Sequence, residues 1–191
     1  MKVLLEEKYF DLCNKFAEDC YPTHKNHYAK RNQFNKDKII EQISLGKLCE
    51  FATYQVLSDK YPDLSLPDTA VYTGSKKSFD FDMKANNLNL HIKGQLQSSA
   101  KLYGQSWIFQ WAGDGKGHCD KEIFYPTIKN QYVSFVLMDK KVADICAIVS
   151  LDFLHEHNLF KLPKLDYLQK TKRAVYWDDL KAFSKEDLWQ L

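Results

Sequence analysis

Hydrophobic residues recur at helical spacing in two stretches near the N-terminus of the chain. Spacings of three and four predict a helix over residues 3–19 and a longer helix over residues 37–60, which Pro62 ends. Gly46 lies inside the second helix and predicts a close approach of a strand or a phosphate, because glycine otherwise weakens a helix. The basic residues 22–38 between the helices predict either a solvated loop or a segment that contacts DNA.

Strand-like patterns dominate the second half of the chain. Short apolar or alternating runs predict strands at residues 105–111, 132–138, 142–149 and 174–177. Only three residues join the second and third of these runs, so we expect them to be antiparallel neighbours. Helices followed by strands predict an α/β fold with a mixed central β-sheet flanked by helices, in a single domain over residues 1–191.

Residues 78–95 are predicted to form a β-hairpin with one apolar face and one polar face. Asn86-Asn87 fits a two-residue turn, because asparagine tolerates the left-handed conformation that such turns require. This turn pairs Met83 with Leu90, Asp82 with His91, Phe81 with Ile92 and Asp80 with Lys93. One face is then apolar, and the other carries Asp80, Asp82, His91, Lys93 and Gln95. This polar face is either a solvent-facing surface with ordinary charge pairs or a metal and phosphate site.

Glu50 favours the second interpretation. It lies in an apolar stretch of the second helix, where a carboxylate is costly unless it has a partner or a function. Its alternative interpretation is a position at the exposed edge of that helix.

Glu50, Asp82 and the tripeptide His91-Ile92-Lys93 together resemble the PD-(D/E)XK nuclease superfamily, which has the restriction-endonuclease-like fold. The family pattern is a helix Glu, an Asp on one strand of a hairpin, and Glu/Asp-X-Lys on the other strand. The resemblance covers about residues 39–150, and the strand at 105–111 fits the core sheet of that family. It implies a metal-dependent DNA endonuclease of restriction or phage type that uses Mg²⁺, for which Mn²⁺ can substitute.

The resemblance also implies roles for individual residues. Lys93 would orient or activate the attacking water and contact the phosphate, and Gln95 would position the water or a phosphate. The implied metal ligands are Asp82, Glu50, Asp80 and the carbonyl of Ile92.

His91 departs from the family pattern, because it stands where the family has Glu or Asp. Mg²⁺ prefers oxygen ligands, so three interpretations stay open. Asp80 or Glu50 compensates for the missing carboxylate, or His91 serves in proton transfer, or the site is inactive. The third interpretation makes the chain a catalytically degenerate nuclease-fold domain that acts as a nucleic-acid-binding or protein-interaction module.

Composition limits how the protein could bind nucleic acid and where in the cell we expect it. Hydrophobic residues make up 45% of the chain and the formal net charge is +2, so nucleic-acid binding must come from a local patch. The five cysteines show no zinc-ligand spacing and no run is long and apolar enough for a membrane span, so we expect a soluble cytoplasmic protein. Cleavage of both DNA strands would be served by a homodimer.

Overall fold

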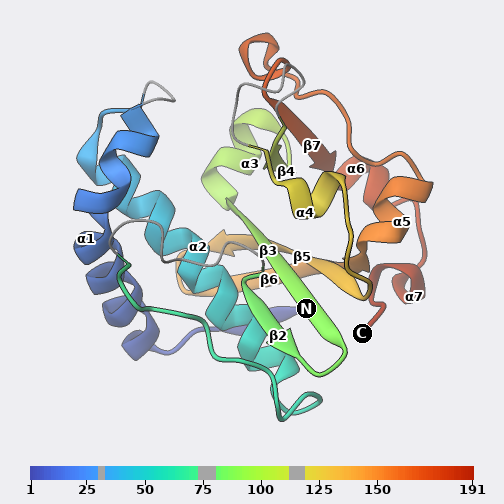
Figure 1. The fold of residues 1–191 in the computed structure, drawn as a ribbon, viewed down its shortest axis with the longest axis horizontal. Coiled ribbons are helices and arrows are strands. Elements are labelled where there is room, and N and C mark those ends of the chain that lie inside the picture. The colour runs from blue at the N-terminus through green and yellow to red at the C-terminus, as the bar shows by residue number, and fades with distance from the viewer. Residues whose placement is uncertain (30–32, 73–80, 112–118) are drawn as a thin grey trace.

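A mixed five-stranded β-sheet flanked by helices forms the centre of the fold and confirms the predicted α/β class (Figure 1). The computed structural model describes residues 1–29, 33–72, 81–111 and 119–191. The strand order is β1-β6-β5-β3-β2, in which β3 and β5 run parallel and the other neighbours run antiparallel. The strands are β1 (Lys2–Leu4), β2 (Met83–Ala85), β3 (Leu88–Leu96), β5 (Gln131–Asp139) and β6 (Val142–Ser150).

The hairpin of β2 and β3 has the predicted register next to its turn. Met83 pairs with Leu90 and Ala85 pairs with Leu88. The strand pairing ends at Met83, so the predicted pairs of Asp82 with His91 and of Phe81 with Ile92 do not form as expected, and the predicted pair of Asp80 with Lys93 lies outside the described residues. The ring of Phe81 contacts His91 rather than Ile92, and the carboxylate of Asp82 reaches the backbone N–H of Ile92.

Two long helices cover one face of the sheet, with α2 (Lys36–Leu57) lying across it and α1 (Glu7–Ala29) beside α2 (Figure 1). Asn35 caps α2 by accepting a hydrogen bond from the backbone N–H of Lys38. The predicted solvated loop over residues 22–38 is wrong for most of its described residues, because α1 continues through Pro22. Buried side chains of α1 pack beside α2 ahead of Pro22, and this packing outweighs the hydrogen bond that proline cannot form.

The close approach between helix and sheet occurs at Gly94 in β3, and not at Gly46. A Cβ atom on Gly94 would lie 2.5 Å from Sγ of Cys49, whereas a Cβ atom on Gly46 would meet nothing within 4 Å. The prediction that a strand approaches Gly46 is therefore wrong. The contact between Gly94 and Cys49 sets the distance between α2 and β3.

A second, two-stranded sheet lies on the other side of the molecule (Figure 1). It pairs β4 (Ser106–Gln110) with β7 (Lys172–Tyr176), so the expectation that the strand at 105–111 joins the core sheet is wrong. Trp107 and Phe109 of β4 pack on Phe135 of β5, which makes this small sheet a second layer over the first. The remaining helices are α3 (Gln97–Tyr103), α4 (Lys121–Phe124), α5 (Leu151–Glu156), η1 (Asp166–Leu168), α6 (Trp177–Leu180) and α7 (Lys185–Leu188).

Two apolar clusters follow from these layers. One joins α2 to the hairpin and to β6, and the other fills the space between the central sheet and the β4–β7 sheet. Within the described parts of the chain, none of the helices has the length and hydrophobicity needed to cross a membrane.

Candidate functional site

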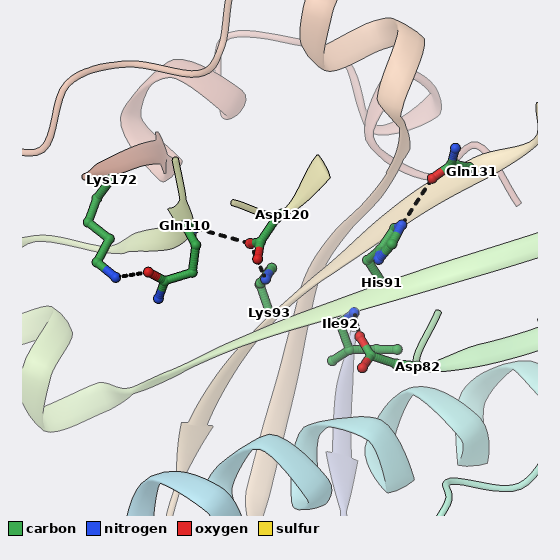
Figure 2. A network of polar contacts seen from close by, with 8 residues as sticks. All are labelled: Asp82, His91, Ile92, Lys93, Gln110, Asp120, Gln131 and Lys172. Carbon is green, nitrogen blue, oxygen red and sulfur yellow. Dashed lines mark hydrogen bonds and ion pairs between the residues drawn. The ribbon is translucent and has the colours of Figure 1, made fainter. Parts of the chain in front are cut away.

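Strand β3 carries the predicted site residues on two different faces. Gly94 faces α2, where it meets Cys49. The side chain of Lys93 lies on the opposite face, with its ammonium 4.9 Å from the ring centroid of Phe109 in the second layer. Figure 2 shows His91 on the same side of β3 as Lys93, and the carboxylate of Asp82 on the other side. The predicted common polar face is therefore wrong for Asp82, because β2 begins only at Met83 and strand alternation does not fix the side chain that precedes it (Figure 2).

Lys93 is held in an ion pair that the sequence does not reveal. Its Nζ atom lies 3.1 Å from Oδ2 of Asp120, and the two side chains are 26% and 16% exposed. The same carboxylate oxygen accepts a hydrogen bond of 3.0 Å from the backbone N–H of Gln110 in β4 (Figure 2). Asp120 is thus fixed by the second layer and fixes the ammonium of Lys93 in turn.

Gln110 extends this network to β7. Its side-chain carbonyl accepts a hydrogen bond from the ammonium of Lys172 (Figure 2). Two lysines, one on β3 and one on β7, therefore lie on either side of Gln110 and Asp120. These lysines come from strands that are far apart in the sequence, and the Asp120 carboxylate offsets the charge of Lys93.

His91 is buried and neutral. Its ring is 7% exposed, and Nε2 lies 3.1 Å from Oε1 of Gln131. Gln131 donates through Nε2 to the carbonyl of Ile128, so its Oε1 faces His91 and the histidine donates. Burial lowers the pKa of His91 more than the hydrogen bond to Gln131 and the charge of Asp82 raise it. The ring is consequently held as part of the scaffold.

Asp82 lies at the open edge of β3, where β2 has ended. Its Oδ2 atom accepts a hydrogen bond of 2.7 Å from the backbone N–H of Ile92 (Figure 2). The N–H and C=O groups of one strand residue point to the same edge, so the carbonyl of Ile92 is directed toward this edge as well. The structure therefore brings together two of the predicted metal ligands, the Asp82 carboxylate and the Ile92 carbonyl.

Glu50 has an ionic partner in its own helix. Its Oε2 atom lies 2.6 Å from Nζ of Lys47, and the side chains are only 8% and 9% exposed. The ammonium of Lys47 also lies over the ring of Phe16 in α1, 5.4 Å from its centroid. Among the described residues, the polar contacts of Asp82 and Lys93 do not include Glu50.

Two predicted site residues remain, Gln95 and Asp80. Gln95 uses its amide within the fold, because Nε2 donates to the carbonyl of Gly104 and Oε1 accepts from the backbone N–H of Ser106. These bonds fix the turn between α3 and β4, where Gly104 has a φ of 86°. Asp80 lies outside the described residues.

Glu122 in α4 is a further acidic residue that sequence reasoning missed. Its Oε2 atom is buried and has no hydrogen-bond partner in the described part of the chain. Its charge raises the pKa of His91, although the effect of burial is larger. Neither Asp120 nor Glu122 lies in a periodic hydrophobic pattern of the sequence, and only their place in the tertiary structure brings them near β3.

The residues at the open edge of β3 fit a partial Mg²⁺ site. Mg²⁺ is commonly bound through one or two carboxylates, with waters and substrate phosphates as the other ligands. Oδ1 of Asp82 takes part in no hydrogen bond among the residues described, so it is available as a ligand beside the Ile92 carbonyl. The same residues contain no cluster of three or more His, Cys, Asp or Glu side chains that is suited to a metal ion.

No protein-family model, curated protein or solved structure matches this chain.

Proposed function

We propose that the protein is a metal-dependent nuclease of the restriction-endonuclease-like class that hydrolyses phosphodiester bonds in DNA. The observation that carries the proposal is the contact of 2.7 Å between the carboxylate of Asp82 and the backbone N–H of Ile92. This contact puts the aspartate beside the backbone of the residue that precedes Lys93, while its carboxylate lies on the other side of β3 from the Lys93 ammonium (Figure 2).

Each residue of the site has a separate role in this proposal. Asp82 and the Ile92 carbonyl would hold Mg²⁺, which supplies a Lewis acid for the phosphate and lowers the pKa of a bound water. Lys93 contributes a fixed positive charge for the phosphate, because Asp120 and the Phe109 ring hold its ammonium in place. Asp120 acts through Lys93 as a positioning residue. His91 supports the strand through Gln131.

A second candidate is a nuclease-fold domain that binds nucleic acid or a protein without cleavage. Two observations favour it. Glu50 is paired with Lys47, and His91, at the position of the family carboxylate, is a buried neutral ring. A homodimer with two-fold symmetry would suit the first candidate, since each DNA strand would then have its own active site.

Cleavage of supercoiled plasmid and linear phage DNA with Mg²⁺, Mn²⁺ or EDTA separates the two candidates. We expect metal-dependent cutting by the wild type, with losses of about a hundredfold or more in Asp82→Asn and Lys93→Met. Asp139→Asn and Lys101→Met alter exposed residues of the same types and serve as matched controls. Intact DNA binding in EDTA without cutting in any metal would favour the binding module, and full activity of Lys93→Met would refute the proposed centre.

A further inference from the structure

A small cavity lies in the second layer, at some distance from the open edge of β3. It has a volume of about 160 Å³ and is lined by both aromatic rings and polar groups. This volume equals that of about five water molecules, which suits one planar ring and excludes a duplex. The aromatic lining residues are Trp111, Phe124 and Phe160, and the polar ones are His155, Asn158 and Arg173.

Phe109 connects this cavity to the candidate site. Its ring lies under the ammonium of Lys93, 4.9 Å from centroid to nitrogen. The same ring meets Phe160 edge-on, with centroids 5.2 Å apart, and Phe124 at 6.4 Å. A ligand in the cavity would therefore be separated from Lys93 by two aromatic side chains, Phe160 and Phe109.

Arg173 forms a flat platform at the cavity. Its guanidinium carbon lies 3.5 Å from the ring centroid of Trp111, which is a stacked arrangement. Nη1 donates to the carbonyls of Gln169 and Lys172 at 3.0 and 2.7 Å, and these bonds fix the plane. Within the described residues, Nε and Nη2 donate to no protein group. Arg173 thus offers a fixed plane and unused donors.

His155 and Asn158 supply hydrogen-bonding groups of other kinds. Nε2 of His155 lies 2.8 Å from the carbonyl of Ile123, so this nitrogen donates and Nδ1 is left as an acceptor. The side-chain amide of Asn158 makes no hydrogen bond to the described residues, and its backbone has a φ of 51°. An acceptor, an amide and a guanidinium edge around a flat aromatic space match the donors and acceptors on the edge of a nucleobase.

Basic residues are frequent in the segment that supplies Arg173 to the cavity. The segment 161–173 carries five Lys or Arg residues and one acidic residue, Asp166. It lies alongside β7, because the backbone of Lys161 exchanges hydrogen bonds with that of Ala174. Such a segment can neutralise the phosphates of a strand that crosses the cavity. Its basic residues are Lys161, Lys164, Lys170, Lys172 and Arg173.

We propose that this cavity binds one unstacked nucleobase of a single-stranded nucleic acid. The base stacks on the Trp111–Arg173 pair, the polar lining reads its edge, and the segment 161–173 holds the neighbouring phosphates. Aromatic side chains and guanidinium planes are the usual stacking partners of exposed bases. A role for the bound strand as a substrate rests on the proposed nuclease function, whereas binding itself needs no cleavage.

Binding is measured in EDTA by fluorescence anisotropy with short labelled oligonucleotides. The probes are single-stranded DNA, RNA of the same sequence, the corresponding duplex, and an abasic strand with the same number of phosphates. We expect the two base-bearing single strands to bind at least about tenfold more tightly than the abasic strand, because stacking is lost without bases. Competition by nucleoside monophosphates distinguishes a strand from a free nucleotide as the natural ligand.

Variants test the individual contributions. Arg173→Lys keeps the charge but loses the plane and the fork, so we expect about tenfold weaker binding of base-bearing strands and unchanged binding of the abasic strand. Lys170→Ala is the matched charge control, and it should weaken both strands equally. Asn158→Gly tolerates the positive φ and removes only the amide, so it provides a second variant if Arg173→Lys fails to fold.

The possible outcomes also separate this proposal from the nuclease proposal. Equal affinity for base-bearing and abasic strands, or preference for the duplex, overturns the nucleobase site. Base-dependent binding without cleavage in any metal supports the site and rejects the nuclease. Metal-dependent cleavage that survives Arg173→Lys with unchanged affinity supports the nuclease and rejects the site.

Discussion

The buried pair of Lys47 and Glu50 offers a direct test of what the helix carboxylate does. Both side chains lie between α1 and α2, with 9% and 8% of their surface exposed and 2.6 Å between Nζ and Oε2. The charge of Glu50 also raises the pKa of the nearby Cys13 thiol, although burial is the larger cause. The pair is therefore held in a region of low polarity, where an uncompensated charge is expensive.

Glu50→Gln leaves the Lys47 ammonium buried without its counter-charge. Removal of one partner from a buried ion pair costs about 3–5 kcal/mol, which is a large share of the total stability of about 5–15 kcal/mol for a domain. The exposed pair of Lys15 and Asp19 is the matched control, with side chains 74% and 47% exposed. Asp19→Asn should cost less than about 1 kcal/mol. Lys47→Met combined with Glu50→Leu removes both charges and should restore most of the lost stability.

Urea unfolding followed by circular dichroism gives the free energies, and plasmid cleavage is measured on the same proteins. If the double variant is stable and still cuts DNA, Glu50 is a structural residue. If it is stable and inactive, Glu50 takes part in the reaction despite its pairing. A loss in Glu50→Gln as small as that in Asp19→Asn would refute the argument from burial.

Three further predictions concern glycines and thiols. Gly94→Ala should lower the free energy of unfolding by about 1–3 kcal/mol, since its Cβ would lie 2.5 Å from Sγ of Cys49, and Cys49→Ala should restore part of that loss. Gly46→Ala lies in open space and should instead raise the free energy of unfolding, measured in urea, by about 0.5–1 kcal/mol. Equal effects of the two alanines would contradict the packing argument. Burial raises the pKa of Cys146 to about 12, so the unfolded chain loses this proton first as the pH rises above about 9 and stability falls. Cys146→Ala should flatten that decline by up to about 1.4 kcal/mol per pH unit, and an unchanged slope would be the contrary result. Cys119 and Cys146 are both partly exposed, and burial raises the pKa of Cys146, so Cys119 should react first with a disulfide reagent. A fast phase that survives Cys119→Ser would show that another thiol reacts as readily.

The parts of the fold that were predictable depend on local pattern. The alternation in the hairpin and its Asn86-Asn87 turn fix the register near the turn, because a slip of one residue would expose the apolar face. The runs at 132–138 and 142–149 are joined too closely to be anything but antiparallel neighbours. The pairing of β4 with β7 joins segments about sixty residues apart, and no local pattern records such a partner.

The difference between local patterns and distant contacts also explains which partners of the site residues could be predicted. A carboxylate in an apolar helix requires compensation, and the sequence indicates this for Glu50 without showing what provides it. Lys47 lies one turn earlier and was available as a partner at the spacing that helices favour, so an ion pair within the helix was the nearest solution. Lys93 presents the opposite case. Its partner Asp120 comes from beyond β4, and only the second layer of the fold carries it to β3. The predicted register offered Asp80 as a cross-strand partner of Lys93, so a counter-charge at the expected spacing does not exclude a further partner from the tertiary structure.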